Sequence, residues 1–178
     1  MKPLDYTTLK KFLGLAGNNL IGEWVLIGGT VLPLLGIQYR STTDIDFIEI
    51  TKNKKNQTLQ LMRLTEKINL PIESVNQAGE YFLNKIKNFR KHLVLIHKGK
   101  NATIYRPDIN LFIKLKINRL TESDLLDCLE FLKLSKKLNE KVLSKELLKL
   151  IEKILKKTES NEKYKRLCEL SKNIKENF

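Results

Sequence analysis

The sequence predicts an α+β fold, in which a β-sheet core flanked by helices precedes a helical C-terminal half. Short apolar runs bounded by Gly, Pro and polar residues fill the first part of the chain, as is typical of strands. From Pro107 onward, apolar residues recur at helical spacing. We therefore expect an α/β core over residues 1–107 and a helical region over residues 108–178, packed on that core.

The elements of the first region follow from periodicity and turn residues. The expected helices cover residues 7–16, 31–35, 58–68 and 78–89, and the expected strands cover 24–27, 44–50, 71–75, 92–96 and 102–105. Thr7 or Thr8 is a candidate cap for the first helix. The last two strands are expected to form a hairpin because Gly99 stands in the short polar segment between them.

Helix boundaries in the second region are marked by capping residues. Asp108 precedes the first expected helix, and Thr121 with Asp124 forms a capping-box pattern for the next. The polar run 158–161 is expected to separate the last two helices.

Two aspartates mark the candidate site. Asp44 and Asp46 stand two residues apart in an expected strand, so their side chains project from one face while Ile45 and Phe47 project from the other. Neighbouring carboxylates repel each other unless a cation lies between them, and Mg²⁺ or Mn²⁺ prefers oxygen ligands. The pattern predicts a divalent metal site held by Asp44 and Asp46.

The turn Gly28-Gly29-Thr30 complements the two acids. Glycine lets the chain turn sharply and brings bare N–H groups close to a ligand. These donors and the start of the next helix suit an anion. Thr30 can cap that helix or direct its hydroxyl to a phosphate. One end of this stretch is therefore suited to a polyphosphate and the other to its metal.

These residues resemble the signature of the nucleotidyltransferase superfamily, in which a Gly-Gly-Ser/Thr turn precedes an Asp-x-Asp pair. The form Arg40-x-Thr42-x-Asp44-Ile45-Asp46 is similar to the branch related to AbiEii-type abortive-infection toxins. The resemblance implies a nucleotidyltransferase-like mixed sheet, and nucleotide contacts from the glycine turn, Arg40 and Thr42. On its own, Arg40 reads equally well as a solvated loop charge.

A second block, in the helical region, is also similar to that branch. It consists of Lys114-Leu115, Arg119 and the run Asp124-Leu125-x-Asp127. The resemblance implies that Lys114 and Arg119 contact the nucleotide, that Lys114 neutralises developing charge, and that Asp124 acts as a third catalytic acid. Without the resemblance, Lys114 reads as a solvated helix lysine and Asp124 as a helix cap.

Two further acids compete for the third catalytic position. Glu73 and Asp108 are alternatives to Asp124, because the residues alone do not decide among the three.

The function expected from these motifs is transfer of a nucleotidyl group from an NTP to an acceptor that the sequence does not identify, with RNA and protein as the first candidates and a small molecule as a further one. The resemblance also implies a toxin–antitoxin or abortive-infection setting with a cognate toxin or antitoxin as partner. The alternative is a catalytically inactive nucleotide- or RNA-binding module of the same fold. A third reading is an unrelated α+β protein. The absence of a Walker A loop and of a Gly-x-Gly-x-x-Gly run disfavours the common NTPase and dinucleotide-binding folds.

Composition bounds the partners and the compartment. The net charge of +13 suits a polyanionic partner such as nucleic acid, although an A/T-rich genome would also enrich lysine. No apolar run is long enough for a membrane span, and the N-terminus has no signal-peptide core. Cys128 and Cys168 are more simply free thiols than a disulfide. We expect a cytoplasmic protein that has no membrane partner.

Overall fold

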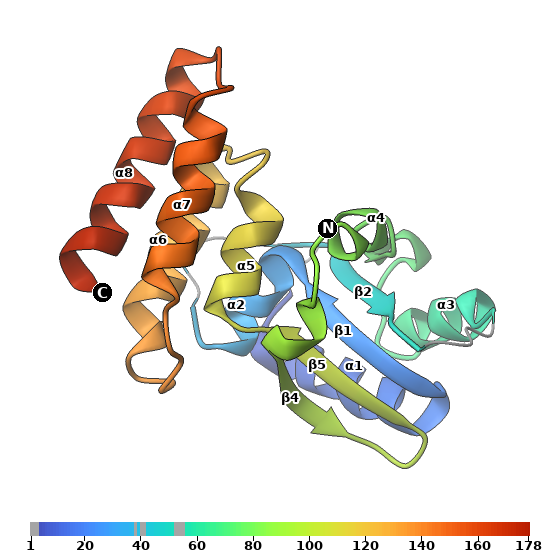
Figure 1. The fold of residues 1–178 in the computed structure, drawn as a ribbon. Helices are drawn as coiled ribbons and strands as arrows, with labels where there is room; N and C mark the ends of the chain where they lie inside the picture. Colours follow the sequence, from blue (N-terminus) through green and yellow to red (C-terminus); the bar gives the residue numbers. More distant parts are fainter. Residues whose placement is uncertain (1–3, 38, 40–41, 52–55) are drawn as a thin grey trace. The chain divides into compact units, whose positions relative to one another are not determined.

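The computed structural model describes residues 4–37, 39, 42–51 and 56–178. The chain divides into two compact units, Met1–Pro107 and Asp108–Phe178. The first unit contains the sheet, and the second contains helices α5 to α8 (Figure 1).

The N-terminal unit is built around a five-stranded mixed sheet with strand order β3-β2-β1-β5-β4. Strand β1 pairs antiparallel with β2 and parallel with β5, while β2 pairs parallel with β3 and β4 pairs antiparallel with β5. The elements are α1 (Tyr6–Asn19), β1 (Gly22–Ile27), η1 (Gly28–Thr30), α2 (Val31–Leu34), β2 (Ile45–Glu49), α3 (Thr58–Glu66), η2 (Ile72–Ser74), β3 (Val75–Asn76), α4 (Glu80–Asn84), η3 (Phe89–His92), β4 (Leu93–Lys98) and β5 (Ala102–Pro107). The expected α+β class and mixed sheet are confirmed.

An aromatic cluster anchors β1 and β2 to α1. Trp24 and Phe47 are stacked with ring centroids 4.9 Å apart, and Phe12 meets Phe47 edge-on at 5.2 Å. All three side chains are fully buried. Burial of this amount of aromatic surface contributes strongly to stability, since each ring removes a large apolar area from water. The cluster lies on the sheet face that carries Phe47, and it leaves the alternate residues of β2 for the other face.

Several expected boundaries differ in the structure. Asp5, rather than Thr7 or Thr8, caps α1, since its Oδ1 accepts a hydrogen bond from the Thr8 N–H at 2.7 Å. The strand expected at 71–75 is mostly η2, because the Ser74 N–H bonds back to the carbonyl of Pro71 and closes a tight turn. The helix expected at 78–89 ends at Asn84, and Asn88 adopts a left-handed conformation with φ of 57°. Such a residue interrupts a right-handed helix.

The C-terminal unit is entirely helical, as expected for this half of the chain. Its helices are α5 (Ile109–Lys116), α6 (Glu122–Ser135), α7 (Ser144–Leu155) and α8 (Asn161–Asn177). Both expected caps are confirmed: Asp108 accepts from the Leu111 N–H at 2.8 Å, and Thr121 with Asp124 forms a capping box. Helix α8 packs against α6 and α7, as Figure 1 shows. No helix in the described part of the chain has both the length and the apolar character of a membrane span.

Candidate active site

The turn after β1 requires glycine at position 28, because strand pairing places the Asp46 side chain against it. Gly28 has a φ of 70°, a conformation that residues with a Cβ rarely adopt. A Cβ at this position would lie 3.0 Å from Asp46 Cγ and would overlap Asp46 Oδ2. The Asp46 carboxylate therefore occupies the space that any other side chain at position 28 would fill. The antiparallel pairing of Ile27 with Asp46 produces this approach.

Thr30 joins the same turn to the beginning of β2. Its side chain is fully buried, and its hydroxyl donates a hydrogen bond to the backbone carbonyl of Asp44 at 2.7 Å. The hydroxyl makes no capping bond to α2, so the first of its two expected roles is wrong, and the second, contact with a phosphate, stays a prediction. Thr30 instead holds the glycine turn beside Asp44, which makes the turn and both acids one local unit.

The two acids differ in exposure. Asp44 is exposed immediately before β2 and accepts a hydrogen bond from the Thr43 hydroxyl at 3.2 Å, while Asp46 is half-buried within the strand. Ile45 and Phe47 are fully buried. This alternation agrees with the expectation that the acids project away from the aromatic core.

Arg40 and Thr42, which precede Asp44, were also predicted to contact the nucleotide. Arg40 lies outside the described residues. Thr42 is half-buried, and its carbonyl accepts a hydrogen bond from the Leu4 N–H at 2.9 Å, which ties the start of the unit to the segment before Asp44. Nucleotide binding by Gly29, Arg40 and Thr42 stays a prediction.

An amide stands beside Asp46 on the neighbouring strand. Asn76 is the β3 partner of Asp46 in the parallel β2–β3 pairing, so the two side chains share a face of the sheet. Asn76 Oδ1 accepts from the Ala78 N–H at 2.8 Å and shapes the turn into α4. Glu73, three residues earlier, is exposed in η2. On the strand next to the acids, the residue beside Asp46 is thus an amide and not a carboxylate.

The two aspartates suit a hard divalent ion. Mg²⁺ is commonly held by one or two carboxylates, with water and substrate phosphates completing its octahedron. Asp46 has room beside Gly28 only because no Cβ fills that space. Among the described residues, no three His, Cys, Asp or Glu side chains are grouped closely enough to bind a metal by themselves. Metal binding by Asp44 and Asp46 stays a prediction.

Within the C-terminal unit, Lys114 forms a salt bridge to Glu146 on α7. The distance between Lys114 Nζ and Glu146 Oε1 is 2.8 Å, and the lysine side chain is only 11% exposed. This contact joins α5 to α7. Charge neutralisation at a nucleotide by Lys114 stays a prediction.

Asp124 belongs to a buried ion network centred on Lys116, which the exposed side chain of Arg119 joins from the surface. Lys116 Nζ lies 2.8 Å from both Asp124 Oδ1 and Asp127 Oδ2, and all three side chains are buried. Arg119 adds a two-pronged contact to Asp124 through Nε at 2.8 Å and NH2 at 2.9 Å. The Thr121 N–H and hydroxyl also donate to Asp124. Both oxygens of Asp124 are therefore engaged inside this unit.

The electrostatic effect on Asp124 is large. Burial alone would favour the neutral acid, but hydrogen bonds from Arg119 and the charge of Lys116 outweigh it and hold the pKa of Asp124 well below its ordinary value. The carboxyl is thus ionised at any physiological pH. The network favours a role for Asp124 in joining α5 to α6. Its role as a third catalytic acid stays a prediction.

Comparison with protein families decides the class. Residues 7–177 match the model of the family described as "Nucleotidyltransferase of unknown function (DUF6036)". The chain belongs to this family. The superfamily inferred from the Gly-Gly-Thr and Asp-Ile-Asp motifs is confirmed, whereas the AbiEii-type branch stays a prediction. No curated protein and no solved structure matches the chain.

Sequence reasoning missed two residues of this nucleotidyltransferase. Lys116 could have been found, because it falls at helical spacing with Ile109, Phe112 and Ile113, and a lysine on a buried helix face requires a carboxylate partner. Asn76 gave no such signal. Its position beside Asp46 comes from pairing between strands far apart in the sequence.

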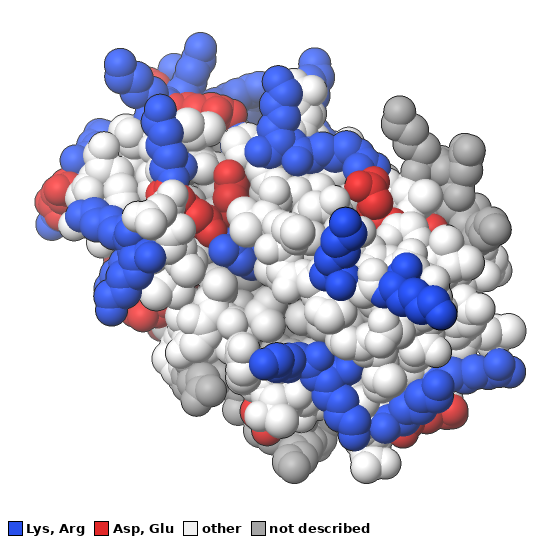
Figure 2. All heavy atoms as spheres, turned by 90° about the horizontal axis from the view of Figure 1, so that it is seen from below, with Lys and Arg blue, Asp and Glu red and all other residues white. Residues whose placement is uncertain are grey.

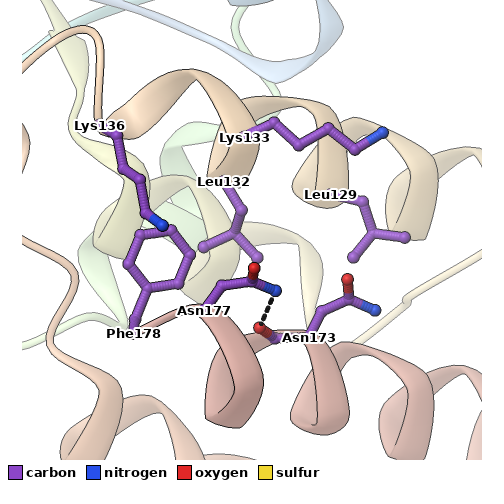
Figure 3. Close-up of a pocket in the computed structure, with 7 residues that line it drawn as sticks. All are labelled: Leu129, Leu132, Lys133, Lys136, Asn173, Asn177 and Phe178. Atoms are coloured by element: carbon purple, nitrogen blue, oxygen red, sulfur yellow. Dashed lines mark hydrogen bonds between the residues drawn. The ribbon is translucent and has the colours of Figure 1, made fainter.

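The nucleotidyltransferase also has a pocket of about 360 Å³ in its C-terminal unit (Figure 3). The pocket lies between α6 and α8, and Lys136 lies over the ring of Phe178 with its Nζ 5.0 Å from the centroid. It is lined by Leu129, Leu132, Lys133, Lys136, Asn173, Asn177 and Phe178. None of these is a predicted site residue, so the pocket and the motif residues of this unit are separate features.

The net charge of +13 is not gathered into one patch on the face shown in Figure 2. Lys and Arg side chains stand there in separate groups, with Asp and Glu among them. On this face, therefore, the charge does not single out one binding site for a polyanion.

Proposed function

We propose that this nucleotidyltransferase binds an NTP with Mg²⁺ or Mn²⁺ at Gly28, Asp44 and Asp46 and transfers the nucleotidyl group to an acceptor hydroxyl. The observation that carries the proposal is the approach of Asp46 to Gly28 in a chain of nucleotidyltransferase family. That approach places a carboxylate directly beside the backbone of Gly28, which has no side chain. The Arg40–Asp46 motif supports a toxin–antitoxin or abortive-infection setting, and RNA or protein is the acceptor class.

In the proposed reaction, the acceptor oxygen forms a bond to the α-phosphorus as the bond from that phosphorus to the bridging oxygen breaks. The electron pair leaves with pyrophosphate, and the hydroxyl proton passes to solvent. A bound divalent ion supplies charge neutralisation and orientation of the triphosphate. Asp44 and Asp46 hold and orient it, while the backbone of the glycine turn leaves the phosphates room to approach. Thr30 keeps turn and acids together through the Asp44 carbonyl.

A binding module without turnover is the second candidate function. It is favoured by Asn76, which places an amide rather than a carboxylate beside Asp46. Sites that use two metals in phosphoryl transfer need enough negative ligands to hold both ions. With two acids, a single ion binds more readily than a pair.

A transfer assay separates the two functions. The full chain is incubated with each α-³²P-labelled NTP, Mg²⁺ and either total RNA or a protein lysate, and products are separated after nuclease or protease treatment. We expect label in one acceptor class, loss of label with Asp46→Asn, and full transfer with the control Glu66→Gln, an exposed acid on α3. Mg²⁺-dependent NTP binding without any transfer would support the binding module instead.

A further inference from the structure

The helix α4 carries two aromatic side chains that the fold does not use. Tyr81 is 63% exposed and Phe82 is 54% exposed, whereas Leu83 is the buried residue of this helix. The two rings contact each other edge-on with centroids 5.4 Å apart. Exposed apolar side chains that form a contiguous patch are candidates for an interaction site, and these two rings are contiguous.

Positive charge accompanies the pair. Lys85 Nζ lies 3.8 Å from the centroid of the Tyr81 ring, and Lys87 and Lys91 are exposed nearby in sequence. Residues 81–92 contain four Lys and Arg and no Asp or Glu. Arg90 is engaged by Glu23 at 2.8 Å and by the Ile50 carbonyl, so it anchors the segment to the sheet. Lys85, Lys87 and Lys91 are exposed, so a ligand that stacks on the rings can also reach their ammonium groups.

The start of α4 contacts the strands that carry the candidate active site. Asn76, the strand partner of Asp46, bonds to the Ala78 N–H and so sets the start of α4. A Cβ at Gly79 would lie 2.5 Å from Ile27 Cδ1 and 3.2 Å from Ile48 Cδ1. Close packing of Gly79 on these two residues brings α4 onto the sheet next to the strand ends that carry the glycine turn and Asp46. A ligand on α4 is therefore near the site of transfer.

We propose that Tyr81, Phe82, Lys85 and Lys87 bind single-stranded nucleic acid, which is the acceptor of the transfer reaction. The assignment as acceptor rests on the proposed function. Nucleobases have two flat apolar faces that stack on aromatic rings, and each base brings a phosphate for a lysine. A surface that combines exposed rings with lysines fits single-stranded nucleic acid better than it fits an acidic protein. An acidic protein would use the lysines but would not need both rings. Duplex RNA hides its base faces and fits less well.

The test measures binding of a fluorescein-labelled oligo(U) RNA of about ten nucleotides by fluorescence anisotropy, using the full chain with EDTA and without NTP. The variants are Tyr81→Ala, Phe82→Ala and Lys85→Gln with Lys87→Gln. The matched controls are Tyr164→Ala, a 49% exposed aromatic on α8, and Lys149→Gln with Lys153→Gln on α7. Blunt duplex RNA and polyglutamate serve as competitors.

We expect each aromatic substitution to weaken RNA binding by about fivefold or more, because stacking of one base contributes about 1–3 kcal/mol. The double substitution Lys85→Gln with Lys87→Gln should lower the affinity for RNA and the salt dependence of that affinity. Both control variants should bind RNA like the parent. Absence of RNA binding, or binding of the Tyr81 and Phe82 variants as tight as that of the parent, would overturn the proposal. Competition by duplex RNA or polyglutamate as strong as that by unlabelled oligo(U) would also overturn it.

Failure of this proposal is distinguishable from failure of the proposed function. Asp46→Asn should lose NTP binding and keep RNA binding, whereas Tyr81→Ala and Phe82→Ala should keep Mg²⁺-dependent NTP binding and lose transfer to RNA. An RNA acceptor that is labelled equally by the aromatic variants would refute this surface while leaving the transferase intact.

Discussion

Gly28 and Asp46 are in direct steric contact: the carboxylate of Asp46 lies where the Cβ of any other residue at position 28 would stand. Antiparallel pairing of β1 with β2 brings them together, and the left-handed conformation of Gly28 allows it. The first glycine of the Gly-Gly-Thr motif and the second acid of the Asp-Ile-Asp motif thus depend on each other sterically. A change in either alters the space available to the other.

The first prediction concerns Gly28→Ala. The new methyl group must occupy a left-handed conformation, at a cost of about 1–2 kcal/mol, and must also displace Asp46. We expect lower stability in urea unfolding and loss of NTP binding in calorimetry. Gly36→Ala is the control, because Gly36 has a φ of 81° but no atom within 4 Å of an added Cβ. If the two variants behave alike, backbone strain rather than the Asp46 contact explains the effect.

Asp46→Asn tests the metal site without changing the size of the side chain. Loss of one carboxylate should lower transfer by several orders of magnitude, since metal templating contributes several kcal/mol and about 1.4 kcal/mol is tenfold in rate. The free energy of unfolding should change by no more than about 1 kcal/mol. Rate measurements and urea unfolding on the same preparation check both. Undiminished transfer would show that Asp46 does not hold the metal.

Lys116→Met tests the buried network of the C-terminal unit. The substitution leaves Asp124 and Asp127 without their shared cation, and breaking a buried ion pair in this way costs about 3–5 kcal/mol. Lys133→Met is the control, because Lys133 is 71% exposed and its salt bridge is to Glu130, one turn away on the same helix. Urea unfolding should separate the two variants clearly. A Lys116 variant as stable as the control would mean that the network contributes little.

The depressed pKa of Asp124 predicts a pH dependence of stability. Its pKa in the folded protein lies below that in the unfolded chain, so the unfolded chain takes up the proton first as the pH falls. The stabilisation is fully present above about pH 5 and is lost as the pH falls toward the folded pKa. In urea unfolding across this range, the parent should converge on Asp124→Asn. A constant difference between the two proteins at all pH values would contradict the linkage.

Lys114 has two testable roles. As the partner of Glu146, which is 56% exposed, it makes a salt bridge worth no more than about 1 kcal/mol, so Glu146→Gln should lower the free energy of unfolding by that amount or less. Lys114→Ala should cost more, because it also removes a side-chain stem that is only 11% exposed. As a nucleotide contact, Lys114 would lower NTP affinity when replaced, and Glu146 would not. Calorimetry with a non-hydrolysable NTP on both variants decides between these roles. Equal NTP affinity of both variants and the parent assigns Lys114 to the α5–α7 contact alone.

Features that depend on near neighbours in the chain were predictable from the sequence. The strand before Gly28, the alternation of Ile45 and Phe47 with the acids, and the caps at Asp108 and Thr121 all follow from local rules. The family motif of the N-terminal unit needed no structure for its recognition. The misplaced ends of α4 and of the segment 71–75 were local too, but short turns replaced the expected elements there: the Ser74 N–H bonds to the Pro71 carbonyl, and Asn88 has a φ of 57° beyond the end of α4.

Which side chains meet was decided only by the tertiary structure. Asn76 lies beside Asp46 because β2 and β3 pair across almost thirty residues of intervening chain, and Lys116 rather than Lys114 meets Asp124 because of how α5 and α6 pack. The physical reason is that secondary structure arises from interactions between residues close in sequence. Contacts between elements depend on burial and pairing energies summed over the whole unit, and a one-residue shift in a strand or helix exchanges one partner for another.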